Sequence, residues 1–380
     1  MTQLTMGVLA TSRKENEFRL PIHPSHFGRI DDQVRRALYF EEGYARRFGT
    51  STADLEAASA GVMSRSELLA ECDVIVLPKP QVEDLAEMKE GQVLWGWPHC
   101  VQDRALTQQA IDLRLTLIAW EAMNRWNRDG SFGLHVFHMN NELAGYCSVL
   151  HALRLIGRTG SYGPSMRAAV ISFGATGRGA VTALRAMGIH DVTILSHRAP
   201  AAVESPAHAV AMGQIVRDED DPSRPLAVVE DHTRPMVEEL AAHDVVVNCV
   251  FQDPDDPQIF VRNDDLGLFR PGSLIVDVSC DEGMGFEWAR PTSFEEPMFT
   301  VGDRVNYYAV DHSPSYLWDA ATWEISDSLL PFLPLVGGGP EKWDADETVA
   351  KAIEIRDGVI QNPKILSFQG RSPEYPHGPI

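Results

Sequence analysis

Eight short runs of apolar and β-branched residues recur along this chain, with segments of helical length between most of them. They fall into two groups, before residue 120 and after residue 165: residues 4–10, 72–78, 92–97, 115–120, 166–174, 191–196, 244–251 and 273–279. Strands separated by helical crossovers form parallel sheets, so the alternation predicts a doubly wound α/β chain. Because the strands form two groups, we expect two sheets.

The segments between and after the two groups indicate how the domains are divided. Residues 142–157 are apolar at helical spacing and predict a connecting helix, and residues 319–336 look helical again. We therefore expect a central domain, residues 139–314, inserted into a discontinuous domain made of residues 1–138 and 315–380. The last stretch, residues 367–380, predicts either a loose tail or an interface arm.

Composition excludes several classes of protein. A net charge of -21 repels phosphate backbones and anionic lipid, so no nucleic acid is expected as a partner. No apolar run approaches the roughly 18 residues of a membrane span, and no leader with a cleavage site is evident, so we expect a cytoplasmic protein without membrane contact. Five scattered cysteines without a CxxC pair indicate reduced thiols and no metal site.

A glycine-rich turn joins the fifth predicted strand to a helix. Against the pattern G-x-G-x-x-G, the turn has Ser172 in place of the first glycine, then Gly174, Ala175, Thr176 and Gly177. Gly174 would let the backbone approach a pyrophosphate, Gly177 would allow close packing of helix on strand, and the amides at the helix start would face the phosphates. The order strand, turn, helix, strand predicts a Rossmann-like dinucleotide-binding domain.

The end of the next strand bears on the choice of cofactor. NAD enzymes usually have an acid there for the ribose 2′-hydroxyl, whereas this chain has Ser196, His197 and Arg198. A hydroxyl and a guanidinium suit a 2′-phosphate, which an acid would repel. We therefore predict NADP(H) in preference to NAD(H); the alternative is that Arg198 is an ordinary surface arginine.

Three polar residues follow strands of the first group. Arg19 lies shortly after the first strand, Lys79 ends another, and His99 ends a third. Ligands of open α/β sheets bind beyond the carboxyl ends of the strands, so these side chains are expected to line one cleft.

Through these residues and the motifs around them, the chain resembles the superfamily of alanine dehydrogenase and pyridine nucleotide transhydrogenase. Within this superfamily it is most similar to the N-delta-(carboxyethyl)ornithine synthases. The matching stretches run in the expected order from about residue 7 to about residue 330: NEFR, Lys79-Pro80, GQVLWGWPH, NNELAGY, the glycine-rich turn, IVDVSCDEG with FEWARPTSFEEPMF, and YYAVDHSPS. The resemblance implies an oxidoreductase that uses a nicotinamide dinucleotide and assembles as a homo-oligomer, a tetramer or hexamer.

The resemblance also implies roles for single residues. Arg19 and Lys79 would hold the carboxylate and carbonyl of a 2-oxo acid, which suits a bidentate guanidinium and a compact ammonium. His99 would be the acid/base group and Asp281 the catalytic aspartate. The alternatives are a packed histidine and a turn residue before glycine. Two further cofactor contacts are expected at Asn248 and His312, the latter where related dehydrogenases have asparagine.

Two departures from the alanine dehydrogenases favour the synthase branch. They are Ser172 in the glycine-rich turn and the missing acid at the end of the strand at residues 191–196. The leading hypothesis is an NADPH-dependent reductive condensation of a 2-oxo acid, pyruvate in the first instance, with the amine of an ornithine- or lysine-like amino acid. Glu121 and Glu142 are candidates for holding the ammonium. The alternatives are an alanine dehydrogenase using ammonia, a saccharopine-type enzyme with an extra cation from Arg13 or Lys14, and a non-catalytic NADP(H) sensor.

Overall fold

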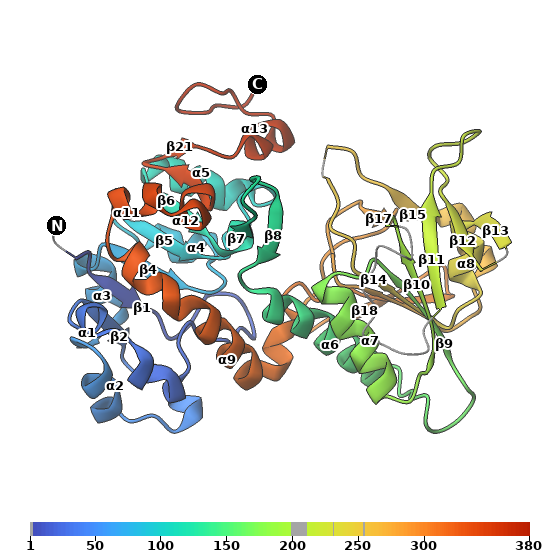
Figure 1. Cartoon of the computed structure of the whole chain (residues 1–380), viewed down its shortest axis with the longest axis horizontal. Helices are drawn as coiled ribbons and strands as arrows, with labels where there is room; N and C mark the ends of the chain where they lie inside the picture. Colours follow the sequence, from blue (N-terminus) through green and yellow to red (C-terminus); the bar gives the residue numbers. More distant parts are fainter. Residues whose placement is uncertain (1–2, 199–210, 231, 254) are drawn as a thin grey trace. The chain divides into compact units, whose positions relative to one another are not determined.

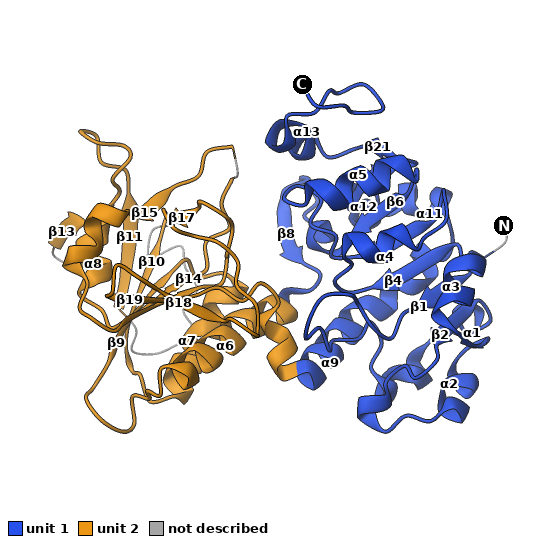
Figure 2. Cartoon of the chain, turned by 180° about the vertical axis from the view of Figure 1, so that it is seen from behind, with its two compact units in different colours: residues 1–138, 318–380 blue, residues 139–317 orange. Residues whose placement is uncertain are grey.

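The computed structural model describes residues 3–198, 211–230, 232–253 and 255–380 (Figure 1). The chain divides into two compact units, coloured separately in Figure 2: residues 1–138 with 318–380, and residues 139–317. A central unit is therefore inserted into a discontinuous one. The second boundary falls between residues 317 and 318, where the sequence predicts it between residues 314 and 315.

The discontinuous unit is built on a sheet whose described strands run in the order β21-β20-β6-β5-β4-β1-β2-β3. Strands β1 to β6 are parallel, β20 is antiparallel to β6, and β21 is antiparallel to β20. The parallel strands thus follow the 3-2-1-4-5-6 order of the Rossmann fold. Their bounds are Met6–Val8, Leu38–Glu41, Gly61–Met63, Val74–Leu77, Val93–Gly96 and Thr116–Ala119 for β1 to β6, with Ile353–Arg356 for β20 and Val359–Ile360 for β21.

The central unit repeats this order. Its described strands run β13-β12-β11-β10-β9-β14-β16-β19-β18, in which β11, β10, β9, β14, β16 and β19 are parallel. The edge strands β12, β13 and β18 are antiparallel to their neighbours. The bounds are Arg167–Ile171 (β9), Asp191–Ser196 (β10), Ala211–Val216 (β11), Leu226–Val229 (β12), His232–Pro235 (β13), Val245–Asn248 (β14), Ser273–Asp277 (β16), Met298–Val301 (β18) and Val305–Tyr308 (β19). The predicted fold class is confirmed.

Both faces of the parallel strands are covered, which explains their continuous apolar runs. In β9, Ala168 and Val170 belong to one hydrophobic core, whereas Ala169 and Ile171 belong to another on the opposite face. Successive side chains of a strand point to opposite faces, so a strand buried on both sides needs apolar residues throughout. All eight predicted strands are present in the structure.

Short helices surround the sheet of the discontinuous unit. Two of them begin with reciprocal capping boxes, Ser51 with Asp54 and Ser64 with Glu67, which satisfy backbone donors at the helix start. The helical segments are η1 Pro24–Arg29, α1 Asp32–Arg35, η2 Arg46–Phe48, α2 Thr52–Ala58, α3 Arg65–Glu71, α4 Val82–Ala86, α5 Arg104–Asp112, η3 Trp120–Ala122, α9 Trp318–Leu329, η7 Leu330–Phe332, α10 Leu333–Val336, α11 Pro340–Ala345, α12 Glu347–Lys351 and α13 Pro363–Gln369. A hairpin, β7 Asn124–Trp126 with β8 Phe132–His135, precedes the boundary.

In the central unit, α6 (His138–Leu155) includes most of the predicted connecting helix and packs closely on α7 (Ala175–Ala186), as Figure 1 shows. A Cβ atom added to Gly145 would lie 1.9 Å from the Thr176 carbonyl oxygen, and one on Gly179 would lie 1.8 Å from that of Glu142. Only glycine permits this approach of the two helices. The remaining elements are α8 Met236–Ala241, η5 Asn263–Leu268, η6 Ser313–Leu317 and the small pair β15 Ile259–Val261 with β17 Gly285–Phe286.

The final stretch packs on its own unit. The Arg371 side chain is buried and donates to Gln369 Oε1 at 2.6 Å and to the His377 carbonyl at 3.2 Å. The buried His377 ring accepts the Ile360 N–H at 3.1 Å. These bonds tie the final stretch to its own unit, so it does not form a loose tail.

Candidate functional site

Arg19 lies in the loop that follows β1 and is 5% exposed. Its Nε donates to Glu17 Oε1 at 2.8 Å, its Nη2 donates to the same carboxylate, and its guanidinium carbon lies 5.0 Å from the centre of the Trp97 ring. Glu17 and Trp97 thus fix the plane of the guanidinium. A guanidinium held in this way has a fixed orientation, which suits recognition of a planar carboxylate.

Lys79 follows β4 and is buried beside the same loop. Its carbonyl accepts the Ser12 hydroxyl, and the carbonyl of the preceding Pro78 accepts the Trp97 N–H at 2.9 Å. Trp97 in turn packs against Trp120 with ring centres 4.7 Å apart. These contacts bring the carboxyl ends of β1, β4, β5 and β6 together, as parallel strands require.

His99 follows β5 in the left-handed backbone region, with φ of 48°. Its backbone N–H donates to Glu121 Oε1 at 2.6 Å, and its ring Nδ1 lies 3.9 Å from the same oxygen. The imidazole is 41% exposed, so it is accessible and not a packed core histidine. A positive φ at a non-glycine residue is costly and often marks a functional position.

Glu121 sits in η3, directly after β6. Burial and the nearby Glu354 carboxyl raise its pKa to about 8, opposed by the His99 N–H and the Lys79 ammonium. Its Oε2 is buried and has no hydrogen-bond partner among the described residues. Of the two acids considered for the ammonium, Glu121 lies beside His99, whereas Glu142 lies on α6 in the central unit.

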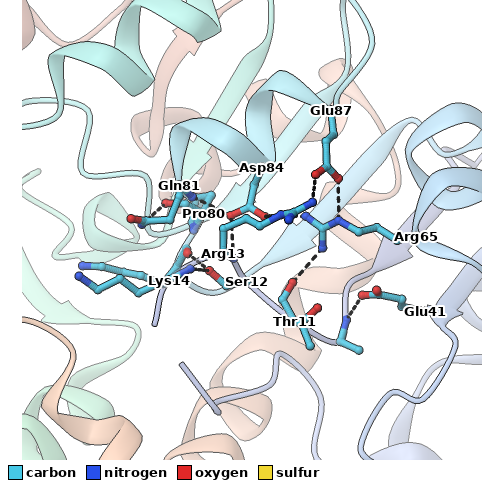
Figure 3. A network of polar contacts seen from close by, with 12 residues as sticks. Thr11, Ser12, Arg13, Lys14, Glu41, Arg65, Pro80, Gln81, Asp84 and Glu87 are labelled. Atoms are coloured by element: carbon cyan, nitrogen blue, oxygen red, sulfur yellow. Dashed lines mark hydrogen bonds and ion pairs between the residues drawn. The ribbon is translucent and has the colours of Figure 1, made fainter. Parts of the chain in front are cut away.

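A polar network holds the loop after β1 against α4 (Figure 3). The Asp84 carboxylate accepts from the Gln81 N–H at 2.8 Å, the Arg13 N–H at 3.2 Å and Arg65 Nη2 at 2.5 Å. Arg13 also pairs with Glu87, toward which its side chain extends in Figure 3. Arg13 thus shares the Glu87 carboxylate with Arg65, whose Nε lies 2.8 Å from it.

The glycine-rich turn of the central unit joins strand β9 to helix α7, in the order that the sequence predicts. Ser172 follows the last residue of β9, has a φ of 75° and donates its N–H to the Leu195 carbonyl at 2.7 Å. The left-handed conformation explains why glycine is usual at this position. Gly174 caps α7, which begins at Ala175 and Thr176, and a Cβ on Gly177 would lie 2.4 Å from the Ser172 carbonyl oxygen.

The strand-end residues of β10 differ from one another in exposure. Ser196 is buried, and its hydroxyl accepts the Arg198 N–H at 3.1 Å. Arg198 is exposed, but its Nη2 donates to the Phe173 carbonyl of the glycine-rich turn at 3.3 Å. The pKa of His197 is lowered by partial burial, opposed by a hydrogen bond to Gln258, so its ring is neutral near pH 7.

A cavity of about 390 Å³ lies beyond the carboxyl ends of β10 and β11. Its lining includes His197, Arg217, Ser223 and Arg262, together with Asp256 from the segment after β14. Two guanidinium groups against one carboxylate give the lining a net positive charge. The sequence singled out Arg198 at this strand end and neither Arg217 nor Arg262, which follow β11 and β15.

The second strand end of interest is that of β16. Asp277, its last residue, is fully buried and accepts from Asn248 Nδ2 at 3.0 Å, the Tyr307 hydroxyl at 2.7 Å and the Cys280 N–H at 3.1 Å. Burial raises its pKa to about 6. These bonds fix the turn that carries Asp281, which is partly exposed and whose charge also raises the Asp277 pKa.

Two predicted cofactor contacts are buried. Asn248 is 1% exposed and its amide is bonded to Asp277, so it orients that carboxylate. His312 is 1% exposed, with Nδ1 2.7 Å from Asp311 Oδ1 and its ring 4.8 Å from that of Phe294. Arg19, Lys79 and His99 thus lie in the discontinuous unit, and Asp281 and the nucleotide candidates lie in the central unit.

Two Rossmann-type units, one with a dinucleotide turn and the other with cations and an imidazole at its strand ends, define an oxidoreductase that uses a nicotinamide dinucleotide. The models of the alanine dehydrogenase/PNT N-terminal and C-terminal domains match residues 7–142 and 159–363. The chain belongs to the alanine dehydrogenase/PNT family. The predicted family and enzyme class are confirmed. Separately, no helix in the described part of the chain is long and apolar enough to cross a membrane.

Relatives cover nearly the whole chain at low identity. The alanine dehydrogenase of Halomonas elongata is 27% identical over 91% of this chain and 92% of its own. The N(5)-(carboxyethyl)ornithine synthase of Clostridium botulinum is 22% identical over 82% and 89%. Among solved structures, an L-alanine dehydrogenase has a TM-score of 0.75 at 22% identity, and the match covers 96% of this chain and 99% of the other. The transhydrogenase from Sinorhizobium meliloti has a TM-score of 0.68 at 19% identity, and the match covers 94% of this chain and 99% of the other. These structures support the fold.

Proposed function

We propose that the chain catalyses reductive condensation of a 2-oxo acid with the amine of a second amino acid, using NADPH as the hydride donor. The observation that carries the proposal is the group at the strand ends of the discontinuous unit: Arg19 fixed by Glu17 and Trp97, buried Lys79, and accessible His99 next to Glu121. A guanidinium, an ammonium and an imidazole are the groups needed to hold a carboxylate, polarise a carbonyl and transfer a proton.

The size of the 2-oxo acid follows from the charges around this group. A second substrate carboxylate, as in 2-oxoglutarate, needs a further cation. Arg13 is already paired with Glu87, and its Nε lies 4.0 Å from Asp84 Oδ1. This argues against Arg13 as that further cation.

Glu121 favours an amine that enters as an ammonium group. A carboxyl with a pKa of about 8 can accept a proton near neutral pH, and a primary ammonium must lose one before its nitrogen attacks the carbonyl carbon. Free ammonia has the same requirement, so an alanine dehydrogenase remains the second candidate, supported by the relatives of that name.

NADPH is proposed because the end of β10 lacks an acid and a cationic cavity lies beside it. Arg217 and Arg262 line that cavity, and Arg198 lies on the adjoining turn. Guanidinium groups form strong, charge-assisted hydrogen bonds with phosphate oxygens. Asp281, on the turn fixed by Asp277, is proposed as the carboxylate on the nicotinamide side.

The test is a matrix of initial rates of NADPH oxidation. Pyruvate and 2-oxoglutarate are each combined with ammonium, alanine, ornithine, lysine or arginine. We expect turnover with pyruvate and a diamino acid at least tenfold faster than with pyruvate and ammonium. Equal or faster turnover with ammonium alone would support the alanine dehydrogenase instead.

A further inference from the structure

An exposed arginine, Arg47, lies beside the loop that carries Arg19 and has no part in the chemistry proposed above. It belongs to the short helical turn η2, and its guanidinium carbon lies 3.7 Å from the centre of the Phe18 ring. Phe18 stands between Glu17 and Arg19, whose side chains are hydrogen-bonded to each other. Arg47 therefore contacts the same loop that holds the guanidinium assigned to the 2-oxo acid.

The start of α9 brings a second aromatic ring to Arg47. The N–H of Leu20, directly after Arg19, donates to Thr322 Oγ1 at 3.0 Å, so the beginning of α9 lies against this loop. Trp318 precedes Thr322 by four residues, and residues at that spacing share one face of a helix. The centre of the Trp318 ring lies 5.8 Å from the Arg47 guanidinium carbon, which is within cation-π distance.

The positive charge of Arg47 is not neutralised by the residues that the structure describes. Within the described ranges, no carboxylate lies at ion-pair distance from its guanidinium, and no group accepts a hydrogen bond from it. Asp319, which follows Trp318, contacts His23 Nε2 at 3.2 Å. A ring engages the face of a guanidinium, whereas the N–H groups lie in its plane. The N–H groups of Arg47 are therefore available to a ligand anion.

The proposed reaction has two carboxylates to hold. The 2-oxo acid carries one, which is assigned to Arg19, and the amino acid that supplies the amine carries another. A carboxylate that leaves water for a binding site needs a cationic or hydrogen-bonding partner, and a guanidinium can bind it through two parallel hydrogen bonds. Free ammonia and simple diamines have no carboxylate, so they have no such requirement.

We infer that Arg47, stacked on Phe18 and close to Trp318, binds the carboxylate of the amino acid that supplies the amine. The inference rests on the proposed function and deepens it, because it names a residue that distinguishes an amino acid from ammonia. Arg47 acts on substrate specificity, and it takes no part in proton or hydride transfer. An interaction that is equally strong in the ground state and the transition state affects KM and leaves kcat unchanged.

The first test compares Arg47→Gln with Arg46→Gln, a matched change at the preceding exposed arginine, whose guanidinium lies against Gly43. Initial rates of NADPH oxidation are measured with pyruvate and either ornithine or lysine, and with 1,4-diaminobutane or 1,5-diaminopentane, which lack the carboxylate. Arg47→Gln should raise the KM for the amino acids about tenfold or more, because a charge-assisted hydrogen bond is lost. Its kcat, its KM for pyruvate and its rates with the diamines should match those of Arg46→Gln.

A conservative variant separates the charge from the geometry. Arg47→Lys keeps the positive charge and loses the planar fork, so its KM for the amino acids should lie between those of the wild type and Arg47→Gln. Circular dichroism and NADPH fluorescence check that all variants are folded.

A second readout does not depend on turnover. Phenylglyoxal modifies exposed guanidinium groups, and peptide mass spectrometry measures the rate of modification at Arg47 in the Arg46→Gln variant. In the presence of NADPH, ornithine or lysine should slow this modification, whereas 1,4-diaminobutane should not. If no amine supports turnover, the proposed function fails, while the protection of Arg47 still tests the inference.

Two results would overturn the inference. One is an Arg47→Gln variant whose KM values equal those of Arg46→Gln, together with no protection of Arg47 by either amino acid. The other is a raised KM for 2-oxoglutarate in Arg47→Gln with unchanged KM values for the amino acids. That result would assign Arg47 to the second carboxylate of a dicarboxylic 2-oxo acid.

Discussion

The two units share one strand order and differ in what their strands end with. In the discontinuous unit the first parallel strand leads to a long loop carrying Glu17 and Arg19, and its neighbours end at Lys79, His99 and Glu121. In the central unit the first parallel strand leads through a glycine-rich turn into α7. The same topology thus provides charged side chains in one unit and amides at a helix start in the other. The residues that follow the strands, and not the fold, therefore determine what chemistry each unit can support.

The largest expected effect comes from removing the imidazole of the discontinuous unit. His99→Ala should lower kcat/KM about 10²- to 10⁴-fold, because a positioned general acid contributes that much. NADPH affinity, measured by fluorescence, should stay within about twofold, since the dinucleotide turn is in the central unit. His190→Ala, an exposed histidine before β10, is the matched control. Full turnover by His99→Ala would remove the proposed proton donor.

A smaller effect is expected from the cationic cavity of the central unit. Arg217→Gln and Arg262→Gln should each weaken NADPH binding roughly tenfold and leave NADH binding unchanged, because a charge-assisted hydrogen bond contributes about 1.5–3 kcal/mol. Titration with 2′,5′-ADP and 5′-AMP separates the phosphate from the rest of the nucleotide. The control is Arg270→Gln, whose side chain is 74% exposed in the same unit. Equal losses for NADPH and NADH would argue against a 2′-phosphate site in this cavity.

Eight strands and the connecting helix could be predicted from sequence, whereas the six-residue strand β11 was not. The fully buried strands and the glycine-rich turn are local patterns, and the order of motifs indicated the family. Strands β2 (LYFE) and β3 (GVM) were missed because they lack the continuous β-branched apolar runs of the predicted strands. Strands β20 and β21 were missed because they join the sheet more than 200 residues after β6.

Candidate site residues were predicted where a strand end carries them. Arg19, Lys79 and His99 follow parallel strands of one sheet, whose carboxyl ends lie at the same edge. Pairings made by tertiary structure could not be predicted: Arg198 with the Phe173 carbonyl, and Asn248 with Asp277. Each depends on the register of neighbouring strands, which one sequence does not specify.

The most direct test of the account follows the hydride. NADPH carrying deuterium at the transferred position is incubated with pyruvate and ornithine or lysine, and the products are identified by mass spectrometry. The account predicts a secondary amine with one deuterium on the carbon that was the pyruvate carbonyl. Labelled alanine formed only when ammonium is present, with no secondary amine from any diamino acid, would contradict it.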